Sequence, residues 1–151
     1  MKDVLPTFLE IVSNLNKKNI IPIIYGSFGL YLILNKEAHV DDLDFIIVRP
    51  DDFPICRNVL GELGFNTDPD HDRELIRNNF YISFIDKADI EKLIDETIKL
   101  NLISLNETSF FNIDIKQYLK IYKKGLENKF RKEKKETEDL KKIREIEDYL
   151  N

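Results

Sequence analysis

Two aspartates inside an apolar segment restrict the fold of this chain more than any other feature. Asp42 and Asp44 stand two residues apart in the run 42–48, which is otherwise apolar. The run predicts a β-strand, and because side chains alternate along a strand, both carboxylates point to one face. Two neighbouring carboxylates repel each other and cost free energy to bury. A divalent cation removes both costs, and hard oxygen ligands suit Mg2+ or Mn2+.

A glycine turn upstream is a candidate seat for phosphate. The apolar run 20–25 predicts a strand that stops at Gly26-Ser27, and residues 28–34 then follow a helical pattern. Glycine lets the backbone approach a ligand closely, and a helix start presents free N–H groups and the positive end of its dipole. The Ser27 hydroxyl adds a donor. The alternative is an ordinary turn, because the segment has neither the lysine of a P-loop nor a GxGxxG pattern.

The two halves together resemble the signature of the nucleotidyltransferase superfamily related to DNA polymerase β. The signature stands here as Tyr25-Gly26-Ser27 followed by Asp42-Leu43-Asp44-Phe45, and a longer loop over 35–40 absorbs a slightly long spacing. Over most of the chain, the resemblance extends to small bacterial nucleotidyltransferases, including those that adenylylate lincosamide and aminoglycoside antibiotics. It implies an α+β fold in which helices flank a mixed β-sheet and a helical pair ends the chain. We expect a single domain over 1–151, with an α/β core over 1–113 and C-terminal helices over 114–151.

The resemblance also implies an activity and roles for particular residues. It implies Mg2+-dependent transfer of a nucleoside monophosphate from a nucleoside triphosphate, such as ATP, to an unidentified hydroxyl acceptor. Asp42 and Asp44 would be catalytic and would hold the metal, whereas Gly26 and Ser27 would bind the nucleotide. Related enzymes bring a third carboxylate from a strand beside the Asp-x-Asp strand. This chain has Ser83 at the matching position, and a serine alone is neither a charged metal ligand nor a useful base.

A predicted hairpin offers a replacement for the missing acid. Residues 72–86 predict two strands with Asn78-Asn79 at the tip, because asparagine tolerates the positive φ of tight turns. This register places Glu74 directly across from Ser83, so Glu74 is the third candidate catalytic residue. The alternative is that Glu74 is a surface acid. Asp86 is a poorer candidate because it lies at the strand end with the opposite parity to Ser83.

The remaining pattern is mostly helical. Apolar spacing predicts a helix over 1–18, another from Phe53 to Leu63, and two helices after residue 113. A second hairpin is expected around Asn106-Glu107. Asp114 with Gln117 resembles a capping box at the first C-terminal helix, and Thr137 is a candidate cap for the second. The expected inward face of the first of these helices comprises Ile115, Leu119, Tyr122, Leu126 and Phe130.

A basic cluster lies between and across the two C-terminal helices. Its members are interleaved with glutamates, which is typical of solvated helix faces. In related transferases, residues of the C-terminal helices meet the triphosphate, so the resemblance implies that one or two of these cations do so here. The cluster comprises Lys123, Lys124, Lys129, Arg131, Lys132, Lys134 and Lys135.

Composition limits the remaining possibilities. The 151 residues are 42% hydrophobic, which supports one substantial core, and the net charge of −5 argues against general nucleic-acid binding. The single cysteine, Cys56, excludes an intramolecular disulfide. With no membrane-spanning run and no signal-peptide pattern, we expect a cytoplasmic protein without membrane contact. His39 and His71 stand far apart in predicted loops, so neither is assigned a metal role.

Two alternatives to a small-molecule transferase remain open. The departure at Ser83 favours a weakened or inactive member of the fold that binds a nucleotide or a protein partner. The other alternative is a transferase of the toxin–antitoxin type that modifies a protein or an RNA end. A chain this short leaves little room for an acceptor domain, so for an active transferase we expect a partner subunit or a homodimer to complete the pocket.

Overall fold

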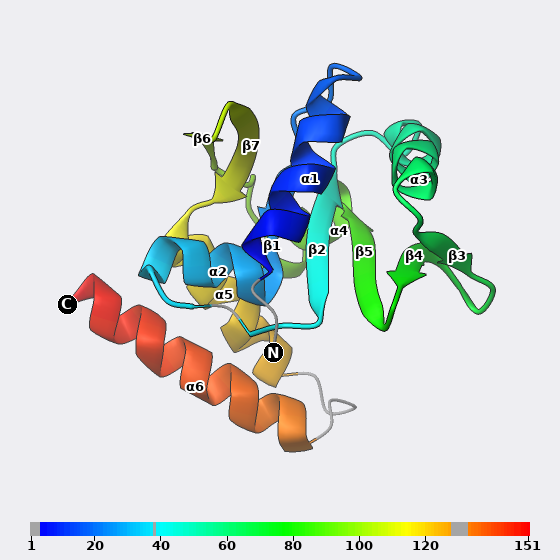
Figure 1. Cartoon of the computed structure of the whole chain (residues 1–151). Helices are drawn as coiled ribbons and strands as arrows, with labels where there is room; N and C mark the ends of the chain where they lie inside the picture. The colour runs from blue at the N-terminus through cyan, green and yellow to red at the C-terminus, as the bar shows by residue number, and fades with distance from the viewer. Residues whose placement is uncertain (1–3, 38, 128–132) are drawn as a thin grey trace.

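The computed structural model describes residues 4–37, 39–127 and 133–151, and these residues form six helices and seven strands (Figure 1). The helices are α1 (Leu5–Asn16), α2 (Gly26–Leu34), α3 (Asp52–Glu62), α4 (Lys87–Ile94), α5 (Ile115–Leu126) and α6 (Glu133–Leu150). The strands are β1 (Ile23–Tyr25), β2 (Asp42–Ile47), β3 (Asn66–Asp68), β4 (His71–Arg77), β5 (Phe80–Asp86), β6 (Leu100–Leu105) and β7 (Thr108–Ile113). None of the helices in these ranges is both long and apolar enough to cross a membrane.

The strands form one mixed sheet in the order β3-β4-β5-β2-β1-β7-β6. The pairs β2–β5 and β1–β7 are parallel, and the other neighbouring strands run antiparallel. The strand with the two aspartates, β2, therefore lies at the centre of the sheet, between β5 and β1. The α+β fold with a mixed sheet, flanking helices and a C-terminal helical pair is confirmed.

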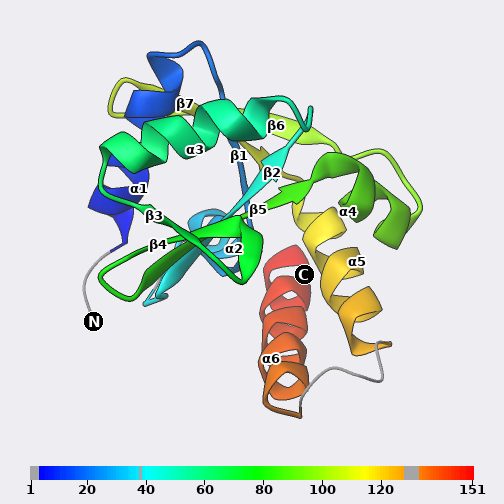
Figure 2. The same ribbon diagram turned by 90° about the vertical axis from the view of Figure 1, so that its right-hand side faces the viewer.

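Helices cover the two faces of the sheet unequally. Figure 2 shows α1 and α3 on one side, and α4, α5 and α6 on the other. The core on the first side contains the aromatic side chains Phe8, Phe45 and Phe110, with the Phe8 and Phe110 ring centroids 4.8 Å apart. The core on the second side contains Tyr118 and Tyr122 among aliphatic side chains. The second side is thus the one that carries buried hydroxyl groups.

Both predicted hairpins are present. Asn78 and Asn79 have φ of 52° and 64°, and Glu74 pairs with Ser83 as expected. Asn106 and Glu107 likewise have positive φ between β6 and β7. Asparagine tolerates this backbone conformation better than most residues, so the Asn78-Asn79 turn and the alternation of its flanking strands were sufficient to predict the register of the first hairpin.

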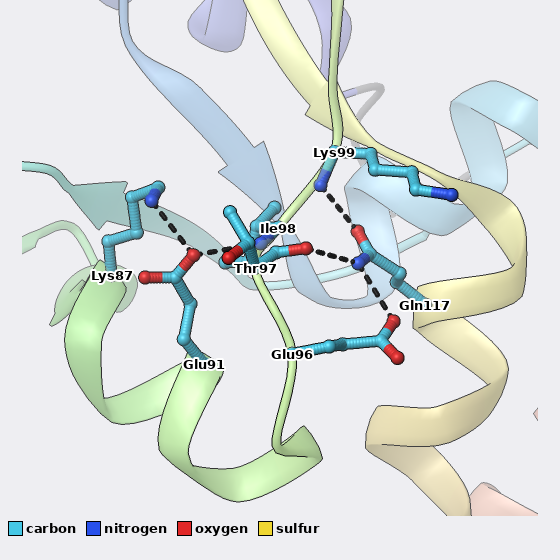
Figure 3. Close-up of polar contacts among 7 residues, drawn as sticks. All are labelled: Lys87, Glu91, Glu96, Thr97, Ile98, Lys99 and Gln117. Atoms are coloured by element: carbon cyan, nitrogen blue, oxygen red, sulfur yellow. Dashed lines mark hydrogen bonds and ion pairs between the residues drawn. The ribbon is translucent and has the colours of Figure 1, made fainter.

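The capping box at α5 is only half correct. The Asp114 side chain does cap the helix by accepting a hydrogen bond from the Lys116 N–H. The buried Gln117 side chain does not reach back to the cap: it donates to the Thr97 carbonyl and accepts from the Lys99 N–H (Figure 3). The Gln117 amide thus pairs with backbone groups of the segment before β6. A second contact fixes the same segment, because Glu91 of α4 accepts from the Ile98 N–H at 2.8 Å.

Two other helix limits differ from the prediction. The first helix begins at Leu5 and ends at Asn16, within the expected 1–18. Thr137 does not cap the last helix, which already includes Glu133. The Lys- and Glu-rich residues before Thr137 have good helix propensity, so the helix extends through them. Phe130, expected on the α5 face, lies outside the described residues.

Candidate active site

Four side chains from four neighbouring strands form a row across the face covered by α4, α5 and α6. The paired positions are Tyr25 with Asp44, Asp44 with Ser83, and Ser83 with Glu74. Side chains at paired positions of adjacent strands point to the same face. The row therefore brings three residues together on one surface: Asp44, Ser83 at the position of the expected third acid, and Glu74 as its candidate replacement.

The glycine turn lies directly against one of the aspartates. Gly26 has φ of +73°, and a Cβ atom built on it would overlap the Asp44 carboxylate. Only glycine meets both conditions without strain. The Asp44 carboxylate is therefore beside the first turn of α2, where Tyr25 provides no side-chain cap and Ser27 follows.

Burial disfavours the charged forms of Asp42 and Asp44, which we call the central pair. Burial, and next the charge of Asp42, raise the pKa of Asp44 to about 7. The pKa of Asp42 is also raised, first by burial and then by the charge of Asp41. Lys135 and Lys142 lower both values but do not cancel the effect. A divalent cation fits this pair, since two carboxylates on one strand offer hard oxygen donors whose charges the chain itself leaves under-compensated.

Lys142 is the functional candidate that sequence analysis missed. Its Nζ donates a hydrogen bond to the Ser27 hydroxyl at 2.7 Å and lies 5.1 Å from the Tyr122 ring centroid. Burial lowers its pKa. A signal existed: Lys142 is three residues after Asp139 and four before Ile146, both buried on α6. A lysine on the buried face of a helix is unusual unless it has a partner.

The basic cluster contributes less than the resemblance implied. Lys135 lines cavities beside the central pair, while Lys123 and Lys124 are exposed. Lys129, Arg131, Lys132 and the Lys134 side chain lie outside what the structure describes. Within the described part, the cations nearest the aspartates are thus Lys135 and the unforeseen Lys142.

Three cavities meet at the central pair. The lysine cavity, about 460 Å³, reaches Asp42 and is lined by Ser27, Lys135, Lys141 and Lys142. The tyrosine cavity, about 290 Å³, touches both aspartates and is lined by Tyr25, Tyr118 and Tyr122 with aliphatic side chains of α4 and α5. The acidic cavity, about 480 Å³, reaches Asp44 and is lined by His71, Asp72, Glu74 and Ser83. The three cavities thus differ in the side chains that line them, and each reaches at least one aspartate of the central pair.

One hydroxyl in the tyrosine cavity is not satisfied. The side chain of Tyr122 is 8% exposed, and its Oη has no hydrogen-bond partner within the described residues. The neighbouring Tyr118 hydroxyl, by contrast, donates to Asn112 Oδ1 at 2.7 Å. A buried hydroxyl without a partner costs free energy, so Tyr122 is a natural contact for a polar ligand atom.

Glu74 lies where the hairpin register predicted. The Ser83 hydroxyl donates to Glu74 Oε1 at 3.3 Å, and both residues line the acidic cavity with Asp44. Asp86 is instead engaged by Arg73, 3.2 Å away at the strand end. The two histidines differ in a way that the sequence did not indicate. His39 Nε2 lies 3.3 Å from Glu37 Oε2, whereas His71 lies close to both Asp68 and Glu74.

The comparisons with known proteins establish the fold. No protein-family model matches the chain. A protein of Bacillus subtilis strain 168 that is itself uncharacterized, YnaI, is 28% identical over 141 residues, which is 90% of each chain. A solution structure of the antibiotic-resistance factor ANT(2'')-Ia superposes with a TM-score of 0.66 at 12% identity, covering 99% of this chain and 86% of that one. A crystal structure of ANT(2'')-Ia in complex with adenylyl-2''-tobramycin gives 0.68 at 11% identity, covering 99% and 91%. This chain therefore has the nucleotidyltransferase fold of ANT(2'')-Ia.

Proposed function

We propose that this chain is a nucleotidyltransferase that moves a nucleoside monophosphate from a nucleoside triphosphate to a hydroxyl acceptor. The observation that carries the proposal is the position of the central pair on β2, directly against the Gly26-Ser27 turn. The same fold in a protein crystallised with adenylyl-2''-tobramycin supports it. The acceptor of this chain is not specified by that likeness.

Asp42 and Asp44 would hold Mg2+ or Mn2+. When bound, the cation supplies charge neutralisation for the phosphates and lowers the pKa of a coordinated hydroxyl. The two aspartates contribute fixed oxygen donors on the most central strand of the sheet. Burial raises the pKa of both carboxyl groups, so a bound cation would stabilise their charged forms.

The lysine cavity is the place for the polyphosphate. The Ser27 hydroxyl and the free N–H groups at the start of α2 would donate to phosphate oxygens. Lys142 Nζ already contacts Ser27 and would move its hydrogen bond to the phosphate. Lys135 adds a second positive charge on the same side. The start of α2 and the two lysines of α6 would thus form the polyphosphate site together.

The tyrosine cavity would take the nucleoside. Its volume lies at the low end for ligand pockets, about 300 Å³, and its walls are largely apolar or aromatic. Tyr122 would offer its unsatisfied hydroxyl to the sugar or the base. The acceptor would then approach from the acidic cavity, which also reaches Asp44.

Glu74 would act as the base. Its carboxylate would take the proton from the acceptor hydroxyl, the oxygen would form a bond to the α-phosphorus, and the bond to the leaving oxygen would break to release pyrophosphate. Ser83 orients the carboxylate through its hydrogen bond to Oε1. Most of the rate would come from positioning and charge neutralisation rather than from the base.

The test is a thermal-shift and calorimetric titration of nucleoside triphosphates with and without Mg2+. We expect Mg2+-dependent binding that raises the melting temperature and that disappears in the double variant Asp42→Asn with Asp44→Asn. Asp51→Asn with Asp52→Asn removes the same charge at the start of α3 and is the matched control. Unchanged binding in the first double variant, or no binding by the native chain at millimolar ligand, would overturn the proposal.

The serine at position 83 favours a second candidate, a nucleotide-binding member of the fold without transferase activity. The two candidates differ in one measurement. A transferase bound to Mg2+ and nucleotide should release pyrophosphate when offered a hydroxyl acceptor, and Glu74→Gln should lower the rate while leaving nucleotide affinity unchanged. A binding module should show nucleotide affinity, and its loss in the aspartate variant, with no pyrophosphate at any acceptor concentration.

A further inference from the structure

We infer a second cation site of different chemistry, in which Asp68, His71 and Glu74 bind a divalent transition-metal ion such as Zn2+. These three residues form the β3–β4 cluster: Asp68 ends β3, His71 begins β4, and Glu74 lies three residues further along β4. The site contains a nitrogen donor, unlike the central pair. Metal binding here does not depend on the proposed transferase activity, but a bound ion would occupy the Glu74 carboxylate and so would prevent it from acting as the proposed base.

The donor atoms already have the spacing of a metal's coordination shell. His71 Nδ1 is 3.2 Å from Asp68 Oδ2 and 3.6 Å from Glu74 Oε2. The ligand atoms of all three residues lie within 4.8 Å of one another. Bonds of about 2.0–2.2 Å to nitrogen and oxygen place neighbouring ligands about 3–3.6 Å apart. An ion could therefore be bound with small adjustments of side chains.

Contacts outside the three donors hold the carboxylates in position. The Asp70 N–H donates to Asp68 Oδ1 at 2.9 Å, and the Ser83 hydroxyl of β5 donates to Glu74 Oε1 at 3.3 Å. In each carboxylate the remaining oxygen is the one that faces His71. Outer hydrogen bonds of this kind orient ligands in known metal sites. Ser83, which stands where related enzymes have a catalytic acid, thus positions Glu74 for the ion through the same hydrogen bond that orients it as the proposed base.

The donor set selects the class of ion. One imidazole and two carboxylates suit Zn2+ and its neighbours, whereas Mg2+ and Ca2+ favour all-oxygen sites such as the central pair. In the metal-free chain, His71 Nδ1 faces one oxygen of each carboxylate. A metal ion would bind the neutral imidazole at that atom.

The site is open to solvent on one side. The His71 side chain is 62% exposed, and His71 and Glu74 lie on the wall of the acidic cavity. An ion can therefore reach the donors without unfolding the hairpin, and water can fill the positions that the protein does not occupy.

The experiment is calorimetric titration of the full chain with Zn2+ in the absence of nucleotide. It uses the Asp42→Asn with Asp44→Asn background, so that the central pair contributes no binding. We expect one equivalent of Zn2+ to bind. Ser83→Ala should weaken binding about tenfold, within the range seen when an outer partner is removed, and His71→Ala, which removes a donor, should weaken it more. His39→Ala, which changes the other histidine, should leave the affinity unchanged.

Three outcomes would overturn the inference: no Zn2+ binding in this background, equal affinity in His71→Ala, or a loss of affinity in His39→Ala. Circular dichroism confirms that each variant is folded, and Glu74→Gln provides a second substitution if His71→Ala is not. Because no nucleotide is present, a negative result leaves the proposed transferase function intact. Conversely, Zn2+ binding without any nucleotide binding would support this site and contradict that function.

Discussion

The central pair and the β3–β4 cluster lie on the same sheet, but the pKa values of their aspartates are shifted in opposite directions. Asp42 and Asp44 are half-buried, and burial raises the pKa of both. Asp68 ends β3 and is partly exposed, and there the Asp70 N–H and then His71 lower its pKa. The first group thus costs the folded protein stability until a ligand arrives, and the second is compensated by its own neighbours. Charge that the chain leaves uncompensated in a cavity is the stronger indication of a ligand.

The largest effect is expected from Gly26→Ala, which should disable the central pair alone. A Cβ would overlap the Asp44 carboxylate, and the φ of +73° would be strained by about 1–3 kcal/mol. We expect a lower free energy of unfolding and the loss of Mg2+-dependent nucleotide binding, while Zn2+ binding at the β3–β4 cluster persists. Denaturant unfolding and calorimetry measure both. Gly61→Ala, with nothing within 4 Å of its Cβ, is the control and should stabilise α3 by about 0.5–1 kcal/mol.

Lys142→Met tests how far α6 compensates the negative charge of the central pair. Loss of a charge-assisted hydrogen bond costs about 1.5–3 kcal/mol, so nucleoside triphosphate affinity should fall about 10- to 100-fold. Arg144→Met removes the same charge from an exposed position on the same helix and should change little. Equal effects of the two variants would mean that α6 acts only through its total charge.

The comparison predicts opposite signs for two Asp→Asn variants in metal-free buffer. The folded pKa of Asp44 is about 7, raised from 3.8, so its contribution to stability is present below pH 4 and is lost as pH rises through 7. Asp44→Asn should therefore stabilise the protein at pH 8, by on the order of 3 kcal/mol, and have less effect at pH 4.

Asp68→Asn should do the reverse. The folded pKa of Asp68 is lowered, so its contribution is present above the unfolded pKa and is lost as pH falls through the folded value. The variant should be less stable than the native chain at pH 8 and should converge with it in acid. Denaturant midpoints at pH 2, 4 and 8 measure both variants. Effects of the same sign at pH 8 would refute the contrast between the two groups.

Tyr122→Phe should produce the smallest change and locate the nucleoside. Its hydroxyl has no partner among the described residues, so removing it should leave the stability of the free protein unchanged or slightly higher. If the hydroxyl contacts the nucleoside, affinity for a nucleoside triphosphate falls about threefold to tenfold. Affinity for inorganic triphosphate, which has no sugar or base, should not change. An equal fall for both ligands would place the hydroxyl at the phosphates instead.

The alternation of apolar and polar side chains was enough to predict the inner part of the site. It placed Asp42 and Asp44 on one face of a strand, and the Asn78-Asn79 turn placed Glu74 across from Ser83, as the structure has them. These are local properties, since a strand's period and a turn's backbone angles depend on residues close in sequence. The α+β fold followed from the same patterns together with the family resemblance.

Only the tertiary structure decided which distant side chains complete the site. Lys142 contacts Ser27, which is 115 positions away in the sequence. The buried Tyr122 hydroxyl has no hydrogen-bond partner among the described residues. The pairing of β3 with β4 brings His71 close to Asp68 and Glu74. Gln117, expected at a helix cap, is drawn to the backbone before β6. Such contacts depend on how helices and strands pack in three dimensions, and the period of a helix or strand carries no information about its partner. The sequence by itself therefore determined the two carboxylates and their turn, and packing determined the cations, hydroxyl and histidine around them.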